Sequence, residues 1–152
     1  MLIESKFFGN IEVADDKIIH FETGLVGFED YKDYTILFDT EKGEERSIMW
    51  LQCTTKKDLA LPVVDPLFLT GEYNPVVEDE LLKSLGGFKE EDLLLLVTLT
   101  VPSDITQMTA NYKAPIVINS STLKGIQIIC ENEEYKVKHP VYDIIKARKG
   151  GE

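Results

Sequence analysis

The sequence predicts a mainly β, single-domain protein, built as an antiparallel β-barrel or a folded-over sheet with one or two short helices. Apolar and polar residues alternate in many short segments, which is the two-residue period of a half-buried strand. Pairs of turn-forming residues separate these segments. Residues 93–101 are almost wholly apolar and threonine-rich, as in a central strand buried on both faces. About ten short strands in one chain favour a barrel, because closure removes exposed sheet edges.

The length and composition fit one folded domain, which we assign to residues 1–149. A chain of 152 residues buries enough apolar surface to fold without disulfides or metals. Hydrophobic residues make up 43% and charged residues 28% of the chain, close to the averages for globular domains. The C-terminal residues 150–152 are expected to fray.

Each short strand is expected where the alternation is bounded by turn residues. The expected strands cover residues 3–7, 11–13, 17–21, 34–38, 48–53, 93–101, 116–118, 125–130 and 135–137. The expected turns lie at residues 9–10, 15–16, 40–46 and 102–104. Gly24 and Gly27 interrupt the chain between two strands, and we expect them to allow positive φ in a tight turn.

The prolines mark a stretch with two open interpretations. Residues 59–69 contain Pro62 and Pro66, and each proline removes a backbone donor from a strand ladder. We therefore expect an edge strand or an extended loop over these residues. At the other end of the chain, residues 141–149 are expected to form a short helix.

The leucine-rich stretch before the central strand also leaves two alternatives. A helix capped at Asn74-Pro75 would place three leucines on one face and end at Gly86-Gly87. Residues 73–77 fit equally well a short strand that precedes a shorter helix. The sequence does not separate these two arrangements.

The formal net charge of −11 narrows the classes of partner. A nucleic-acid surface needs clustered Lys and Arg, so we expect no direct nucleic-acid binding. The negative net charge also disfavours binding to anionic membranes, and we expect no membrane contact. The negative charge serves solubility or attracts a basic protein partner. Since no leader segment or bilayer-length apolar run is visible, we expect a cytoplasmic protein.

No pattern typical of a catalytic or cofactor site is visible. His20 and His139 have no Cys, His or Asp at metal-ligand spacing. Cys53 and Cys130 lie far apart, and we expect two free, buried thiols. The chain has no GxSxG elbow, and its paired glycines form no phosphate-binding loop. We therefore expect a protein that binds other proteins, with no enzymatic activity, metal or cofactor.

Several segments spread over the chain are similar to those of one known family. They are FETGLVGFE at 21–29, WLQC at 50–53 with DLALPVVDP at 58–66, TANYKAPIVIN at 109–119, and GIQ at 125–127 followed by Tyr135. In this order and spacing, over roughly residues 2–142, they resemble the flagellar assembly factor FliW family. Val26 stands where the family often has proline, and Leu61 replaces a frequent aromatic residue.

The resemblance implies partners and a mode of action. It implies a cytosolic protein that binds flagellin and that also antagonises CsrA, an RNA-binding translational regulator. In such a switch, newly made flagellin occupies the factor and leaves CsrA free to repress flagellin synthesis. When flagellin is exported, the released factor captures CsrA and translation resumes. A family member of this kind resembles a flagellin chaperone as well as a switch.

Charge and motif suggest the candidate interface residues. The carboxylates that would meet a basic partner are Glu72, Glu78, Asp79, Glu80, Glu90, Glu91 and Asp92. Asn111 and Asn119, in the TANYKAPIVIN segment, either face a partner or satisfy backbone groups in turns. The motif residues expected to build turns and core are Gly24, Gly27, Pro115 and Ile116.

Two other functions stay open from the sequence alone. A β-barrel can hold a small ligand or cofactor in its interior, which is a common use of such barrels. A hydrolase that uses scattered carboxylates would need a strongly perturbed pair in a cleft. The carboxylates are so numerous that no single pair stands out.

Overall fold

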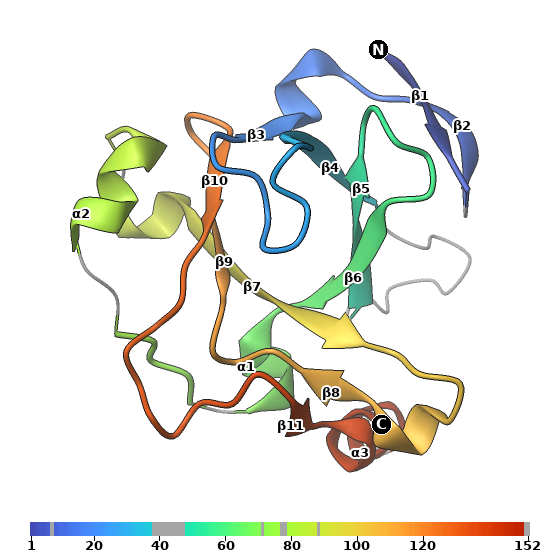
Figure 1. The fold of residues 1–152 in the computed structure, drawn as a ribbon, viewed down its shortest axis with the longest axis vertical. Coiled ribbons are helices and arrows are strands. Elements are labelled where there is room, and N and C mark those ends of the chain that lie inside the picture. The colour runs from blue at the N-terminus through green and yellow to red at the C-terminus, as the bar shows by residue number, and fades with distance from the viewer. Residues whose placement is uncertain (7, 38–47, 71, 77–78, 88, 151–152) are drawn as a thin grey trace.

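A computed structural model describes residues 1–152 except 7, 38–47, 71, 77–78, 88 and 151–152, together with the side chains of 90 and 148–150 (Figure 1). The strands are β1 (Leu2–Ser5), β2 (Gly9–Glu12), β3 (Ile19–Phe21), β4 (Asp33–Leu37), β5 (Ile48–Cys53), β6 (Ala60–Val64), β7 (Leu93–Thr100), β8 (Thr109–Ala110), β9 (Ile116–Asn119), β10 (Lys124–Gln127) and β11 (His139–Pro140). The α-helices are α1 (Pro66–Leu69), α2 (Asp79–Leu82) and α3 (Tyr142–Gly150). Short 3-10 turns are η1 (Asp15–Lys17), η3 (Lys83–Leu85), η4 (Glu90–Asp92) and η5 (Ile105–Gln107).

The strands close into a barrel through β7. The order runs β7-β6-β5-β4-β3-β10-β9, and β9 returns to pair with β7. All of these pairs are antiparallel except β3 with β10, which is parallel. The first half of β7 pairs with β9, and its last two residues pair with β8. The predicted mainly β barrel is therefore confirmed, with one parallel pair in an otherwise antiparallel ring.

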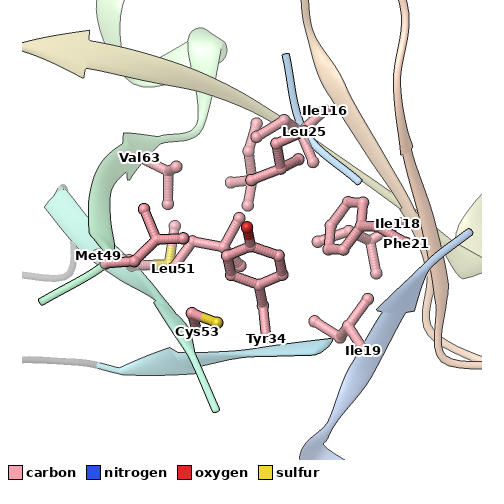
Figure 2. Packing of buried hydrophobic residues seen from close by; sticks show 12 residues of the cluster. Ile19, Phe21, Leu25, Tyr34, Met49, Leu51, Cys53, Val63, Ile116 and Ile118 are labelled. Atoms are coloured by element: carbon pink, nitrogen blue, oxygen red, sulfur yellow. The ribbon is translucent and has the colours of Figure 1, made fainter. Parts of the chain in front are cut away.

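Apolar side chains from every strand of the ring except β10 fill the barrel (Figure 2). Phe21 and Tyr34 pack edge to face, with 5.5 Å between ring centroids and an interplanar angle of 88°. Gly125 lies against the Phe21 ring, and a Cβ there would come within 2.5 Å of it. Full burial of each such large side chain stabilises the fold by about 1.5–3 kcal/mol. The packed interior thus supplies much of the stability of the ring.

The β1–β2 hairpin lies outside the ring and is tied to it by one buried glutamine. Ser5 Oγ donates to Gln52 Oε1 at 2.8 Å, and both side chains are buried. Gln52 Nε2 donates in turn to backbone carbonyls of the β5–β6 connection, including that of Leu59 at 3.2 Å. A buried amide with all its groups bonded fixes the hairpin to the end of β5.

Two of the expected N-terminal turns are shifted or replaced. Gly9 and Asn10 belong to β2 and pair with Ser5 and Glu4, so the turn comes before them. Asp15 begins the 3-10 turn η1. The expected hairpin loop over 40–46 lies outside the described residues, as does Phe7.

Pro62 lies in an internal strand, so the expected edge strand or loop over residues 59–69 is wrong. β6 pairs with β5 along its length but with β7 only at residues 63–64. The N–H of Cys53 donates to the Leu59 carbonyl at 2.9 Å, and this register turns the Pro62 nitrogen away from β5. The Pro62 nitrogen points toward β7, and β7 pairs with β6 only at the two residues that follow Pro62. No ladder hydrogen bond is therefore lost, and proline is tolerated.

The helix expected to start at Asn74-Pro75 starts at Asp79 instead, and the described part of 73–77 forms no strand. The backbone N–H of Asn74 donates to the Tyr135 hydroxyl at 2.8 Å, and this distant contact holds the chain extended. Tyr135 is itself turned into a cluster of aromatic rings. The strand expected over 135–137 therefore does not form, and the next strand in the chain is β11.

Among the other expected strands, the one over 125–130 ends at Gln127, and the one over 17–21 begins only at Ile19. The strands expected over 48–53 and 93–101 are β5 and β7, and α3 matches the expected C-terminal helix. Gly150 closes α3, while 151–152 lie outside the described residues. Cys53 and Cys130 are free and buried. Among the described residues, no helix combines the length and apolar character needed to cross a bilayer.

The FETGLVGFE segment forms a tight loop that plugs the barrel. Gly24 and Gly27 have φ of +69° and +88°, and Phe28 N–H donates to the Leu25 carbonyl at 2.8 Å. This turn drives Leu25 into the core, where it is buried (Figure 2). A Cβ on Gly24 would lie 2.6 Å from the Cα of Glu29, whereas the space around a Cβ on Gly27 is open. The expected structural role of both glycines is confirmed.

The contrast between the two glycines gives a stability prediction. Gly24→Ala should lower the free energy of unfolding by about 3 kcal/mol, because it adds a clash with backbone to the strain of positive φ. Gly27→Ala carries only the conformational strain and should cost about 1 kcal/mol. Urea unfolding of both variants checks this. Equal losses in the two variants would contradict the assigned close approach.

Candidate partner-binding surfaces

The two motif asparagines are used inside the fold. Asn111 Oδ1 accepts from the backbone N–H groups of Lys113 and Ala114 at 3.1 and 3.0 Å. Asn119 is fully buried, and its Nδ2 donates to the Leu85 carbonyl at 2.9 Å. Both residues thus satisfy backbone groups, the second of their two expected roles. Asn119 presents no surface to a partner.

The candidate carboxylates divide into exposed groups and groups engaged in local structure. Glu72, Asp79, Glu80 and Glu91 are exposed. Asp92 is half-buried, and its Oδ2 accepts from the Lys89 N–H at 3.0 Å. Glu80 lies 3.3 Å from the Lys83 ammonium. Glu78 and the side chain of Glu90 lie outside the described part of the chain.

The segment that carries these carboxylates follows one side of the molecule, from the loop after α1 through α2 to the start of β7 (Figure 1). A second acidic segment lies against it. Val76 N–H donates to Asn132 Oδ1 at 2.6 Å, and Glu131 N–H donates to the Val76 carbonyl at 2.8 Å. Asn132 Nδ2 donates back to the Asn74 carbonyl at 3.0 Å. Asn132 therefore holds two distant acidic segments together.

We call the resulting surface the acidic edge. Its exposed carboxylates are Glu72 on one segment and Glu131, Glu133 and Glu134 on the other, and the Lys113 ammonium lies beside them, donating to the Asn132 carbonyl at 2.6 Å. Val76 and Ile129 are exposed apolar side chains within it, at 53% and 66%. Asn132 Nδ2 donates to Glu134 Oε1 at 2.9 Å, and this hydrogen bond lowers the pKa of the Glu134 carboxyl. The sequence did not pair 131–134 with 72–76, because they are joined only by tertiary contacts, made by Asn132 and by the Glu131 backbone.

His20 is held between two carboxylates on the barrel surface. Its Nδ1 lies 2.8 Å from Asp33 Oδ1, and its Nε2 lies 3.0 Å from Glu22 Oε2. The hydrogen bond to Asp33 is the largest effect and raises the pKa of His20 above 6.5; desolvation opposes it, and the hydrogen bond to Glu22 adds a smaller increase. His139 stacks on Tyr112 with 4.5 Å between ring centroids, and burial lowers its pKa below 6.5. No metal-ligand cluster of His, Cys, Asp or Glu occurs among the described residues.

A groove of about 640 Å³ opens at the end of the barrel next to the β1–β2 hairpin. Its floor is formed by Ile19, Met49 and Ile118, which also belong to the barrel core. The other lining residues come from β2 and η1, from β4, from the start of β7 and from the turn before β10. The lining is mostly apolar. A groove of this size and character suits apolar side chains from a ligand or partner.

Leu123 stands at the rim of this groove in an unusual backbone conformation. Its φ is +59°, and no other described residue except glycine has positive φ. Its N–H donates to the Asn119 carbonyl at 2.8 Å, and its carbonyl accepts from the His20 N–H at 2.9 Å. Leucine in this left-handed region costs about 1–2 kcal/mol relative to a relaxed residue. Strained residues of this kind cluster at functional sites.

The barrel interior itself is filled by protein. Leu25, Tyr34, Leu51 and Ile116 meet inside the ring and are almost completely buried (Figure 2). Burial raises the pKa of the Tyr34 hydroxyl, which therefore stays protonated. The small-ligand alternative thus gains no support from the interior.

The fold and these surfaces define a closed, single-domain β-barrel whose motif residues build turns and core and whose exposed features suit macromolecular contact. Comparison with known proteins places it more closely. The sequence profile described as "FliW protein" matches residues 2–141. The chain belongs to the FliW family.

Individual relatives agree with this assignment. The chain is 52% identical over 147 residues to the "Flagellar assembly factor FliW" of Lachnospira eligens, covering 96% of this chain and 97% of the relative. It is 49% identical over 148 residues to the protein of that name from Lachnoclostridium phytofermentans, covering 97% and 95%. A crystal structure of the flagellar assembly factor FliW superposes with a TM-score of 0.82 at 33% identity, over 93% of this chain and 96% of that one.

The two histidines should titrate on opposite sides of their ordinary value. In an NMR pH titration the His20 ring should show a pKa above 6.5 and the His139 ring a pKa below 6.5. His20 binds its proton more tightly when folded, so its stabilisation is fully present below about pH 6.5 and disappears as the pH rises through its folded pKa. The pKa of His139 is lowered by folding, so its contribution to stability changes with pH in the opposite direction and is lost as the pH falls through its folded pKa.

Stability measurements on variants test the same linkage. His20→Asn should therefore cost more free energy of unfolding at about pH 6 than at about pH 8.5, and His139→Asn should show the reverse. A His20 pKa at or below that of His139 would contradict the assigned carboxylate contacts.

Proposed function

We propose that this chain is a cytoplasmic flagellar assembly factor that binds flagellin and antagonises the translational regulator CsrA by partner switching. The observation that carries the proposal is membership of the FliW family over nearly the whole chain. The proposal is of a binding protein and not of an enzyme. No catalytic arrangement stands out among the described residues.

The acidic edge supports the CsrA part of the proposal. Regulators of the CsrA type bind RNA through basic surfaces, so an acidic partner gains from electrostatic steering. The chain has a formal net charge of −11, and the acidic edge gathers part of it from two distant segments. Val76 and Ile129 add apolar area that a purely electrostatic surface would lack. On such a surface the carboxylates would speed association, and the apolar side chains would lose their contact with water on binding.

The switch requires that one partner be released when the other binds. If flagellin and CsrA use overlapping or coupled sites, the bound partner is set by mass action. Newly made flagellin would then hold the factor away from CsrA. Export of flagellin would return the factor to CsrA and relieve repression of flagellin translation.

The direct test is binding of purified partners. The purified chain should form a stoichiometric complex with CsrA and another with flagellin, each detectable by size-exclusion chromatography with mass determination. Adding flagellin to the preformed CsrA complex should release CsrA. If the purified chain bound neither CsrA nor flagellin, the proposal would be refuted. A stable complex of all three proteins would refute the switch.

Charge reversal on the acidic edge gives a sharper prediction. Glu72→Lys with Glu131→Lys should weaken CsrA binding about tenfold and reduce its dependence on salt, because two steering charges change sign. Glu4→Lys with Asp58→Lys changes the net charge equally at exposed positions outside the edge. This control should alter CsrA affinity less than about threefold. Isothermal titration at two salt concentrations measures both. Equal losses would show that only net charge matters.

A further inference from the structure

We propose that residues 72–76 form a strap that opens as a local unit, and that Asn132 is the latch that holds it closed. The strap lies between α1 and α2 and is closed against the segment 131–135 (Figure 1). Opening exposes the thiol of Cys130 and takes the acidic edge apart, while the barrel stays folded. This motion belongs to the chain by itself and does not depend on flagellin or CsrA.

The strap is held as a bound extended peptide is held, by groups that bond to its backbone. Asn132 Oδ1 accepts from the Val76 N–H at 2.6 Å, and Asn132 Nδ2 donates to the Asn74 carbonyl at 3.0 Å. The Glu131 N–H donates to the Val76 carbonyl at 2.8 Å, and the Tyr135 hydroxyl accepts from the Asn74 N–H at 2.8 Å. All four contacts come from one short segment outside the barrel ring. One amide side chain supplies two of them, so Asn132 is the latch.

The strap buries little apolar surface, because Tyr73 is the only buried residue among 72–76. Its ring centroid lies 4.7 Å from that of Tyr135 and 5.6 Å from that of Tyr112, and its hydroxyl donates to the Tyr112 carbonyl at 2.6 Å. The helix α2, which follows the strap, has no buried residue. Segments with few buried apolar contacts and exposed hydrogen bonds open at a lower cost than the core. The strap can therefore leave the aromatic cluster without unfolding of the ring.

Cys130 lies beneath the strap and gives its opening a chemical readout. The residue is 2% exposed, and its Sγ donates at 3.7 Å to the same Tyr112 carbonyl that accepts from the Tyr73 hydroxyl. Because Tyr73 and Cys130 share this acceptor, removal of the Tyr73 side chain uncovers the thiol. Cys53, by contrast, is fully buried within the barrel core.

Opening also separates the two segments of the acidic edge. Glu72 belongs to the strap, whereas Glu131, Glu133 and Glu134 belong to the other segment. A ligand that contacts carboxylates of both segments binds only the closed strap, so it shifts the equilibrium toward closure. Occupancy of the acidic edge and burial of the Cys130 thiol are therefore linked.

Reaction of the two thiols with iodoacetamide tests the strap on the full chain. Each cysteine is followed by peptide mass spectrometry, and its rate is divided by that of the same cysteine in the urea-unfolded chain. Without urea, Cys130 should react at least tenfold faster than Cys53, roughly the ratio expected when a local opening exposes one thiol and global unfolding the other. The Cys130 rate should also rise less steeply with added urea, because a local opening exposes less surface.

Variants separate local opening from global unfolding. Asn132→Ala removes the latch and should raise the Cys130 rate about tenfold, and Tyr73→Phe, which removes one buried hydrogen bond, should raise it about fivefold. Ile19→Val weakens the barrel core and should raise the Cys53 rate about fivefold while the Cys130 rate stays unchanged. Asn10→Ala alters an exposed asparagine of β2, outside the strap, and should change neither rate.

Two results would overturn the strap. Equal rates for Cys130 and Cys53 with the same urea dependence would show that the Cys130 thiol is reached only by global unfolding. A Cys130 rate that neither Asn132→Ala nor Tyr73→Phe raises would show that the strap is not the barrier over the thiol. Either result leaves the proposed function untouched, since no partner is present in the measurement.

Discussion

Closure of the ring through β7 is the constraint on which the rest of the structure depends. β7 pairs with β9 over Leu93–Leu96, with β6 at Val97 and Thr98, and with β8 beyond them. One strand therefore joins the ring to the outer β8–β11 extension. Because the ring closes on itself, no strand of it is left as a free edge, and its surface stays available for side-chain contacts. The acidic edge and the groove are both built on this closed frame.

The most recognisable motifs serve the frame and not the surface. Gly24 allows the turn that drives Leu25 into the barrel, and Asn119 ties the end of β9 to the Leu85 carbonyl. Asn111 closes the turn that leads into β9. Family resemblance therefore identifies the fold strongly and the contact residues weakly. The acidic edge proposed for a partner lies beside the motifs, where Asn132 holds its two segments together.

Most strands could be predicted from the sequence because a two-residue period and turn pairs are local signals. The errors arose where a distant contact overrides a local preference. Pro62 indicates an edge, but the register of β6 gives it a tolerated internal place. Asn74 offers a helix cap, yet its backbone bonds to Tyr135 and Asn132 instead. The acidic edge depends on that same long-range contact. The strain at Leu123 is invisible in sequence, since leucine carries no turn signal.

The central claim is that partners bind the exterior of a barrel that is already closed. Hydrogen–deuterium exchange of the free chain and of its flagellin complex tests this most directly. The account predicts that β7 and β9 amides are the slowest to exchange in the free chain and do not change on binding. New protection should appear only outside these two strands. Fast exchange of β7 and β9 that slows only with flagellin bound would contradict a preformed frame.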